Sequence, residues 1–365
     1  MSNSLGYEID FLPVGNGDRS GDAIAMRYGS PNNYKVIVYD GGTKESGKAL
    51  VDHIRTHYGT NRVDYVINSH PDTDHASGLS VVLEQLDVGE LWMHQPWNYS
   101  SIIRDYFHDG RITDNSLAER LRSKMAAAYY LEKLAEEKNI PVYAPFQGEK
   151  IGCFTVLSPK EDWYIHELVA DFQKSPTKKQ SDISFIIESF SKGLNRATQW
   201  ISEQWDIESL REDVTTSAEN ESSVILFAQI DGKGILLTGD AGVHALSAAI
   251  QNAEARNILL PDTLNFIQVP HHGSRHNVST SVLDRIVGKR KATNDSQITK
   301  TAFVSAGKIS STHPRPSVIN AFIRRGARVV QTKGSTICHS HNMPSRTGWK
   351  SAEVMTFSAQ VESWD

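Results

Sequence analysis

The segment Ser69–His75 (SHPDTDH) places two histidines and two aspartates within six residues, between an apolar run, Val63–Asn68, and a helix-like run, Ala76–Gln85. Imidazole and carboxylate groups at this density repel or desolvate one another unless a cation neutralises them. The alternative is a polar loop in which Asp74 caps the following helix, but a cap needs only one carboxylate. The spacing therefore predicts a metal site at the end of a strand, with the ligands His70, Asp72, Asp74 and His75.

Three other apolar runs end in residues that can bind a metal: Asp40 after 36–39, Asp240 after 235–239, and His271 and His272 after 266–270. In α/β folds, functional side chains lie in loops at strand ends, where a rigid sheet supports them. An aspartate after a strand is usually a turn residue when it stands alone. Together with the 70–75 segment, these positions predict a single site.

Short apolar runs and helical runs alternate along the 365 residues. Tyr7–Val14, Ala23–Tyr28 and Tyr34–Tyr39 predict three strands, joined by turns at 15–17 and 31–33. Two sets of strands, each followed by helices, predict an α/β fold of the four-layered αββα type. No linker divides the chain, so we expect a single domain over 1–365. A helical insertion is expected at about 100–138, rich in strong helix formers from Leu117 to Lys138, and a polar insertion or lid at about 192–222.

Composition narrows the range of partners and locations. The chain has 38 Lys and Arg against 43 Asp and Glu, a net charge of −5, whereas proteins that coat a duplex carry a basic surplus or stripe. The basic runs 289–291 and 324–325 are interpreted as solvated faces. Two cysteines exclude a disulfide scaffold. No apolar run is long enough to span a bilayer and no signal-peptide pattern is present, so we expect a cytoplasmic protein without membrane contact.

From about Tyr7 to Gly334 the chain resembles the metallo-β-lactamase-fold superfamily of hydrolases. The superfamily signature is His-x-His-x-Asp-His, followed by an Asp after Thr-Gly and a His before Gly. The matching residues are His70, Asp74 and His75, then Asp240 after Thr238-Gly239, and His272 before Gly273. Asp72 stands where the second His usually stands. In this it is similar to the soluble nuclease-like domain of ComEC-type competence proteins, with further matches at Val14–Asp18, Asp40–Gly42, Pro270–Ser274, Ser305–Lys308 and His313.

The third His that the superfamily usually supplies to one metal is missing. The corresponding loop reads Glu219-Asn220-Glu221, so that Asn220 or a water is expected to fill the place. The resemblance implies a divalent metal cofactor of one or two ions. Asp74, His75, Asp240 and His272 suffice to hold one ion. Because oxygen donors replace two imidazoles, the metal preference shifts from Zn²⁺ toward harder cations. The candidates are Mn²⁺ and Zn²⁺ first, and Mg²⁺ as a third.

The resemblance implies a hydrolase in which Asp240 bridges cations that activate a water molecule. The ComEC-like features favour a phosphodiesterase or nuclease acting on nucleic acid or a nucleotide. Asp74 and Asp240 are then catalytic, and His313, helped by Lys308, is expected to hold the phosphate or assist the leaving group. Asp40, His271 and Asn220 are candidates for either metal binding or hydrogen bonding to the ligands. His276 and His94 are expected near the cleft without binding metal.

Two other functions remain open on the same scaffold. One is the hydrolysis of lactones, thioesters or other acyl substrates, against which Asp72, the missing third His and the region of Lys308 and His313 argue. The other is a catalytically inactive binding protein, against which the complete ligand set on one side argues. The sequence does not identify a protein partner.

Overall fold

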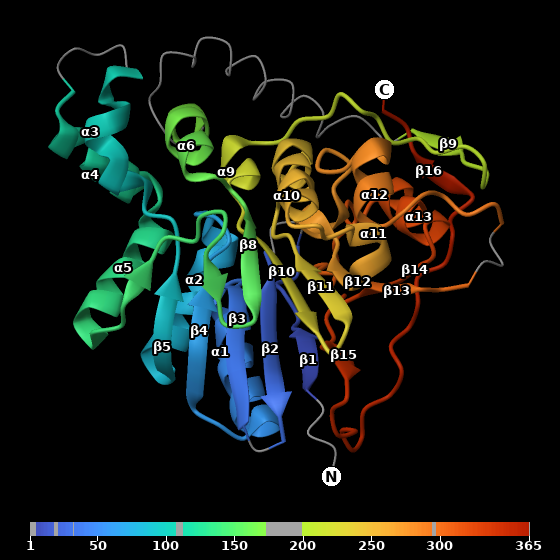
Figure 1. The fold of residues 1–365 in the computed structure, drawn as a ribbon, viewed down its shortest axis with the longest axis horizontal. Helices are drawn as coiled ribbons and strands as arrows, with labels where there is room; N and C mark the ends of the chain where they lie inside the picture. The colour runs from blue at the N-terminus through green and yellow to red at the C-terminus, as the bar shows by residue number, and fades with distance from the viewer. Residues whose placement is uncertain are drawn as a thin grey trace.

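The computed structural model describes residues 5–17, 21–31, 33–106, 112–172, 199–293 and 297–364. Within these ranges two seven-stranded sheets face each other, and helices cover the outer face of each sheet (Figure 1). The predicted α/β class with four αββα layers is therefore confirmed. Asp18 of the Val14–Asp18 motif and Asn32 of the second predicted turn lie outside the described residues.

The first sheet has the strand order β15-β1-β2-β3-β4-β5-β6. The three predicted strands near the N-terminus form its antiparallel part: β1 (Gly6–Phe11), β2 (Ala23–Ser30) and β3 (Asn33–Gly41). Parallel strands then follow: β4 (Arg62–Ile67), β5 (Asp87–Trp92) and β6 (Val142–Tyr143). At the other edge, β15 (Ile337–His341) pairs antiparallel with β1.

Two helices cover the outer face of this sheet and place its loops: α1 (Lys44–His53), which continues as a π-helical turn through Tyr58, and α2 (Thr73–Gln85). They approach β3 closely because the contact is built from glycines. The Gly78 amide donates to the Gly42 carbonyl at 2.9 Å, and a Cβ on Gly78 would lie 1.9 Å from the Gly41 oxygen. The first turn of α2 is thereby held beside the end of β3.

The second sheet has the order β14-β13-β12-β11-β10-β8-β7. Its strands are β7 (Lys150–Ile151), β8 (Phe154–Ser158), β10 (Ile225–Ile230), β11 (Lys233–Leu237), β12 (Leu264–Gln268), β13 (Lys300–Val304) and β14 (Ala327–Gln331). Its outer helices are α10 (Val243–Ala255), α11 (Leu260–Thr263), α12 (Thr280–Ile286) and α13 (Pro316–Arg324). A separate pair, β9 (Trp200–Ser202) and β16 (Gln360–Glu362), lies beside them.

Three hydrophobic cores follow from these layers, one under each helical layer and one between the sheets. Strand β1 contributes Tyr7, Ile9 and Phe11 to the core between the sheets. Because successive side chains of a strand point to opposite faces, Glu8 and Asp10 face the other way, yet both are buried. β1 therefore carries two charged groups into the layer of α1.

The predicted helical insertion forms several helices beyond β5 (Figure 1). They are α3 (Ser100–Ile103), a 3₁₀ turn (Arg104–Tyr106), α4 (Asp114–Lys124) and α5 (Ala126–Lys138), with residues 107–111 outside the described ranges. The run predicted as helix from Leu117 to Lys138 is interrupted at Met125, whose φ and ψ are −111° and 42°. Met125 is 1% exposed, so burial of its side chain accompanies the break.

The interpretation of Arg324 and Arg325 as a solvated face is wrong. Both side chains are fully buried. Arg324 pairs with Glu203 and donates to the carbonyls of 204, 205 and 207, and Arg325 pairs with Glu208 and Asp284. These contacts fix the segment after β9 to α12 and α13. The other run, 289–291, is exposed as predicted.

The polar segment 192–222 is described from residue 199 onward, and residues 192–198 lie outside the described ranges. The described part contains β9, the residues held by Arg324 and Arg325, and α9 (Ala218–Glu221). Its role as a lid stays a prediction. Among the described residues, no helix has both the length and the apolar character needed to cross a membrane.

Candidate metal centre

The carboxylate of Asp240, just after β11, lies at the centre of a group of histidines. Four Nε2 atoms surround it: His75 at 3.4 Å, His271 at 3.6 Å and His70 at 3.8 Å from Oδ2, and His272 at 3.8 Å from Oδ1. The side chain of Asp240 is 6% exposed. Two ligand atoms that share a tetrahedral zinc-type ion lie about 3.4 Å apart, so the spacing suits shared cations rather than direct hydrogen bonds.

Several of these atoms are buried without a hydrogen bond among the described residues: His70 Nε2, His75 Nε2 and Asp240 Oδ1. Buried polar atoms are almost always paired, so an unpaired group that converges on one point needs an explanation. A bound divalent cation supplies one, because imidazole nitrogens and a carboxylate are its usual protein ligands. The residues present therefore fit a metal.

Asp40, at the end of β3, orients two of the imidazoles. It is fully buried, adopts φ of 57°, and accepts hydrogen bonds from Ser69 N at 2.7 Å and Ser69 Oγ at 2.6 Å. His75 Nδ1 lies 2.9 Å from the same carboxylate, and His70 Nδ1 lies 2.9 Å from Ser69 Oγ. Because the only hydroxyl proton of Ser69 goes to Asp40, His70 Nδ1–H must donate to Ser69. Both histidines thus present Nε2 to Asp240.

His271 and His272 stand on a strained turn after β12. Their φ values are 46° and 53°, in the left-handed region that non-glycine residues rarely adopt. Such strain persists where surrounding contacts impose it, often at functional sites. Here the His271 amide donates to the Gly239 carbonyl at 3.2 Å, which fixes the turn beside Asp240. The turn directs both rings toward the same carboxylate.

Asn220, the residue expected in place of the missing third His, contacts the site through His271. Its Nδ2 lies 3.1 Å from His271 Nδ1 and donates to Thr216 Oγ1 at 2.7 Å. The sequence lacks the third histidine of the superfamily, and His271 supplies an imidazole beside Asp240 in its place. Asn220 contacts the other ring nitrogen of His271, on the side away from Asp240.

Asp22 is a site residue that sequence reasoning missed. It precedes β2, is fully buried, and lies with His75, Asp240 and His272 in a group whose ligand atoms are all within 4.8 Å of one another. Gln268 Nε2 donates to its Oδ2 at 2.8 Å, and Ser305 Oγ donates to its Oδ1. Asp22 stands before a strand rather than after one. The only signal in the sequence was an acidic residue beside a fully apolar strand start.

The two remaining aspartates of the 70–75 segment differ in position. Asp72 Oδ2 lies 3.8 Å from His70 Nε2, and the Asp72 side chain is 31% exposed. Although Asp72 precedes α2, its side chain caps no backbone amide of that helix. Asp74 lies in the first turn of α2, and its carboxylate belongs to neither group of three or more ligands among the described residues. Metal binding by Asp74 stays a prediction.

The loop that carries His313 lies against the histidine turn. The rings of His313 and His271 are nearly parallel, 8° apart with centroids separated by 6.3 Å, and Arg315 N donates to the Gly273 carbonyl at 3.1 Å. Lys308 is exposed, and its aliphatic stem lies along Gly334, so the described contacts do not join it to the histidines. The roles of His313 and Lys308 stay predictions.

The two histidines expected near the cleft lie in different surroundings. His94 is buried and stacks on Tyr164 with centroids 4.2 Å apart, inside the core below the helical insertion. His276 follows the histidine turn, and its ring lies 5.4 Å from that of Trp364. Neither belongs to the ligand groups found among the described residues.

Comparison with known protein families gives a match to the metallo-β-lactamase superfamily over residues 17–109. This range contains Asp22, Asp40, His70 and His75. The chain carries a metallo-β-lactamase superfamily domain. Members of this superfamily are mostly hydrolases. The match does not separate the branches of the superfamily, so the ComEC-like resemblance stays a prediction. Comparison with curated proteins gives no match.

Solved structures similar to the metallo-β-lactamase domain share little sequence with it. The metallo-β-lactamase fold protein YhfI from Bacillus subtilis is 9% identical to this chain. The alignment covers 92% of this chain and 100% of YhfI, with a TM-score of 0.42. The metallo-β-lactamase SMB-1 is 12% identical, with 76% and 86% covered and a TM-score of 0.31. A long-form RNase Z from yeast is 10% identical, with 91% and 41% covered and a TM-score of 0.36. Such likenesses say nothing about substrate.

The electrostatics of the site around Asp240 favour a charged Asp240 beside a protonated His75. Burial raises the pKa of Asp240, but the positive charges of His271, His75 and His272 outweigh it and hold that pKa well below its usual value. Burial opposes the charge of His75, yet Asp240 and Asp40 raise its pKa well above the ordinary value. Burial lowers the pKa of His70 and of His271. A metal that binds His75 must therefore displace a proton.

Proposed function

We propose that the chain is a metal-dependent phosphodiesterase that cleaves nucleic acid or a nucleotide. The observation that carries this proposal is the set of buried nitrogen and oxygen atoms around Asp240 that form no hydrogen bond within the described part of the chain. His75, His272, Asp240 and Asp22 would hold one cation, and His70, His271 and Asp72 line the other side of Asp240. A bound divalent cation would activate water and withdraw charge from the scissile group.

The protein's own residues keep this centre rigid and nearly dry. Asp40 and Ser69 hold the rings of His70 and His75 so that no rotation is needed when a ligand binds. Of the side chains that surround the Asp240 carboxylate, Asp72 and His271 are partly exposed, at 31% and 29%. We infer that substrate reaches the centre past these two residues.

The loop of His313 favours phosphoryl over acyl substrates. Its ring lies parallel to that of His271, the exposed side of the cluster, and Nδ1 lies 3.0 Å from Thr312 Oγ1. A fixed imidazole beside the metal residues can donate a hydrogen bond to a phosphoryl oxygen or to the leaving group, where negative charge develops during cleavage. A phosphodiester presents two non-bridging oxygens besides its leaving group to such a donor, whereas an acyl substrate presents a single carbonyl oxygen besides its leaving group.

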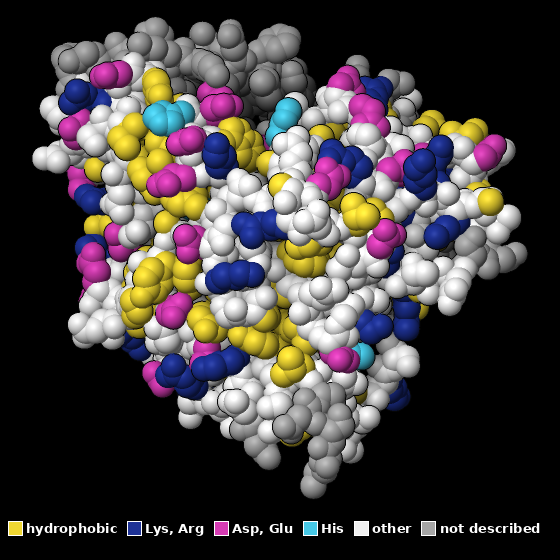
Figure 2. All heavy atoms as spheres, viewed as in Figure 1, with side chains coloured by type: hydrophobic (Ala, Val, Ile, Leu, Met, Phe, Trp, Pro, Cys, Tyr) yellow, Lys and Arg dark blue, Asp and Glu magenta, His cyan; other side chains and the backbone are white. Residues whose placement is uncertain are grey.

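The surface charge bears on the size of the substrate. On the face seen in Figure 2, basic and acidic side chains are interspersed and form no continuous basic field. With a net charge of −5, this favours single strands, strand ends or small nucleotides over long duplexes.

The test compares substrate classes with the metal-loaded protein. Bis-p-nitrophenyl phosphate and p-nitrophenyl acetate are assayed with Mn²⁺, Zn²⁺ and Mg²⁺, and single-stranded DNA, duplex DNA, RNA and cyclic dinucleotides follow. We expect phosphodiester cleavage by the wild type and by Asp231→Asn, a control in the turn of the β10–β11 hairpin that precedes Asp240, and its loss in Asp240→Asn. Cleavage of the acyl substrate alone would make the chain an acyl hydrolase. No activity, together with no stoichiometric metal by elemental analysis, would make it a binding protein.

A further inference from the structure

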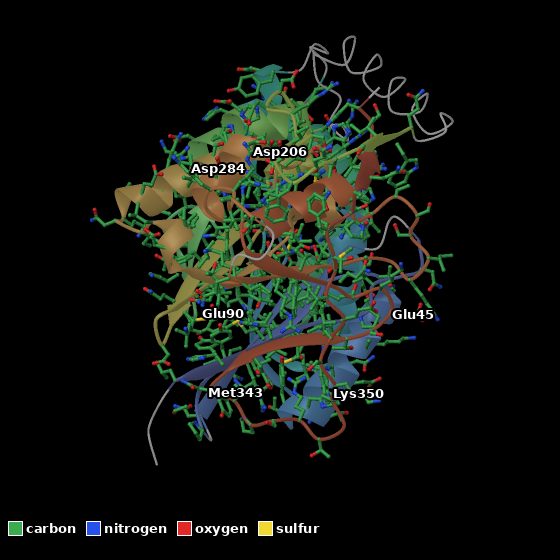
Figure 3. All side chains as sticks on the ribbon, turned by 90° about the vertical axis from the view of Figure 1, so that its right-hand side faces the viewer. Glu45, Glu90, Asp206, Asp284, Met343 and Lys350 are labelled. Carbon is green, nitrogen blue, oxygen red and sulfur yellow. The ribbon has the colours of Figure 1, made fainter. Side chains whose placement is uncertain are left out.

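A large cavity opens on the side of the molecule where both sheets end. The edge strands β14 and β15 contribute two of its walls, and the chain segment 349–356 lines its remaining side. Its volume is about 880 Å³, within the range of cavities that hold small molecules. Figure 3 looks onto this side of the molecule, and Lys350 is labelled there. The side chains that surround Asp240 do not line this cavity, so it is separate from the candidate metal centre.

The segment 349–356 is fixed at both ends and joins the edge of one sheet to the edge of the other. At its start, the indole of Trp349 lies 4.6 Å from the guanidinium carbon of Arg346, which is itself bound to Asp10 of β1. At its end, the Met355 amide donates to the Val329 carbonyl of β14 at 2.9 Å. Residues 350–353 between these contacts belong to no helix or strand. A cavity bounded in this way has room for a small molecule rather than for a polymer.

The charged side chains that line the cavity are mostly basic. Arg328 lies on β14, Lys333 follows that strand, and Lys350 lies on the segment 349–356, whereas Glu353 is the one acidic residue among the described lining residues. Within the described ranges no ion pair joins these three basic side chains to a carboxylate, and Arg328 Nε is buried without a hydrogen bond. A buried donor without a partner needs an explanation, and an anion in the cavity supplies one.

A smaller cavity of about 290 Å³ adjoins the first and extends its basic lining. Arg328 lines both cavities. Lys233 and Lys300 line the smaller one, to which the described part of the chain contributes no acidic side chain. The acidic groups that act on these two lysines, Asp231 and Asp262, lie outside the lining of both cavities. Arg328 is therefore at the junction of two spaces that both favour negative charge.

Neutral hydrogen-bonding groups complete the lining, and apolar side chains form the floor. Burial and the charges of His341 and Arg328 lower the pKa of His339 to about 4, so the ring of this lining residue is neutral at physiological pH. Phe303 and Val330 belong to the core between the sheets. The lining also contains five hydroxyl groups, those of Thr301, Ser335, Thr336, Ser351 and Thr356. Guanidinium, ammonium and hydroxyl donors together are the groups that bind phosphate oxygens.

We propose that this cavity binds a small phosphorylated molecule of about nucleotide size. Arg328 would hold a phosphate through paired N–H bonds, and Lys333 and Lys350 would add positive charge from two other walls. Three basic side chains against one acidic side chain suit the double negative charge of a phosphate better than the single charge of a carboxylate. The site goes beyond the proposed hydrolysis, because none of the residues assigned to metal binding takes part in it.

The first test measures binding to the full-length protein after metal has been removed with a chelator. Isothermal titration uses ADP and ribose 5-phosphate as probes, adenosine as the uncharged probe and citrate as the carboxylate probe. The variants are Arg328→Gln and Lys350→Gln, with Arg285→Gln on α12 and Lys44→Gln at the start of α1 as exposed controls.

We expect at least one phosphate probe to bind the wild type and both controls, with Kd about tenfold higher in Arg328→Gln, a typical loss for a charge-assisted contact. Adenosine alone should not bind. The proposal is overturned if neither phosphate probe binds the wild type, if both cavity variants bind as the wild type does, or if citrate binds more tightly than either phosphate probe.

A second test locates the bound molecule without any substitution, and so does not depend on the folding of Arg328→Gln. Exposed lysines are acetylated with an N-hydroxysuccinimide ester, with and without saturating ADP, and mass spectrometry compares the extent of labelling. We expect ADP to protect Lys333 and Lys350 at least about threefold and to leave Lys44 unchanged. Equal labelling of the two cavity lysines with and without ADP would place any binding elsewhere and overturn the site. Neither test measures hydrolysis, so a failure of the proposed phosphodiesterase activity leaves the result intact.

Discussion

Two groups of buried charges in the same molecule are built in opposite ways. The metal centre lies by α9 and the start of α10. The second group, a buried ion network, lies around Glu8 and Asp10 of β1, near the end of α1 and the C-terminal loop (Figure 1). Figure 3 shows Met343 and Lys350, which flank the loop residue Arg346, at the lower end of the molecule, and Asp206 and Asp284 at the upper end. The two groups differ in how their charges are satisfied.

In the ion network every carboxylate faces donors. Asp10 accepts from both NH groups of Arg346 at 2.7 Å and from Tyr58 Oη at 2.6 Å, and His53 Nε2 lies 3.1 Å away. Glu8 pairs with Arg27 and Arg346 at 2.5 and 2.8 Å. Around Asp240, four imidazole Nε2 atoms lie 3.4–3.8 Å from the carboxylate, and no hydrogen bond joins them to it among the residues that the structure describes. The carboxylates of the first group pair with arginines at 2.5–2.8 Å. The carboxylate of Asp240 has no arginine or lysine partner among the described residues, and the proposed function gives it a bound cation.

The largest effect should come from Asp240→Asn. An amide offers one weaker oxygen to the cation and cannot balance the charge of the histidines. We expect metal content to fall to background and hydrolysis to drop by at least about 100-fold, beyond the usual effect of disturbing residues behind the ligands. Elemental analysis and steady-state assays measure both quantities, with Asp231→Asn as the control. Retained stoichiometric metal would contradict the assignment of Asp240 as the shared ligand.

Removing Arg346 tests the ion network around Glu8 and Asp10. Arg346→Met leaves two carboxylates buried without their main partner, and breaking a buried ion pair costs about 3–5 kcal/mol of the free energy of unfolding. The exposed pair Arg285–Glu254 supplies the control, since Arg285→Met should cost no more than about 1 kcal/mol. Urea unfolding followed by circular dichroism measures both. Metal content should be unchanged in the folded Arg346 variant, and its loss would show that the two groups are coupled.

Much of the fold and part of the site were predictable from local pattern. The three antiparallel strands near the N-terminus and the apolar runs ending at Asp40 and Asp240 follow from alternation and from strand-end chemistry, which are local properties. The burial of Arg324 and Arg325 was not predictable, because their partners Glu203 and Glu208 are more than 100 residues away in the chain. Two adjacent arginines look the same in the sequence whether their side chains face solvent or are buried in ion pairs with distant carboxylates.

Asp22 and His271 show the same limit inside the site. Asp22 becomes a neighbour of His272 only because the β1–β2 connection is packed against the start of α2. The packing is so close that a Cβ on Gly21 would lie 1.6 Å from the main-chain carbonyl oxygen of Asp74. His271 faces Asp240 only because its backbone takes a positive φ. Spacing along the chain predicts which residue types can bind metal, whereas tertiary contacts decide which of them meet.

Asp40→Asn should have an intermediate effect on metal affinity. The amide replaces one acceptor oxygen by a donor. Either the Ser69 amide, bound to Oδ1, loses its acceptor, or Ser69 Oγ and His75 Nδ1, both bound to Oδ2, lose theirs, and in either case the anchor of the His75 ring is weakened. We expect metal affinity to fall about 10–100-fold, as for other residues behind metal ligands. Isothermal titration with Mn²⁺ and Zn²⁺ measures it. Asp64→Asn, another buried aspartate that accepts a backbone hydrogen bond in the same sheet, is the control and should bind metal normally.

The smallest effect concerns the acid stability of the ion network. Burial raises the pKa of Asp10, but hydrogen bonds and charges from His53 and Arg346 outweigh it and hold that pKa well below the ordinary value. A carboxyl group whose pKa is depressed by folding stabilises the fold above about pH 4 and loses this contribution as pH falls toward the folded-state pKa. Without Arg346 the depression is smaller, so less is lost in acid. The difference in unfolding free energy between wild type and Arg346→Met should therefore shrink between pH 6 and pH 3, by about 1 kcal/mol per pH unit at most. A difference that stays constant over this range would place the stabilising effect of Arg346 in the contact of its guanidinium with the rings of Trp349 and Tyr58 rather than in its ion pairs with the carboxylates.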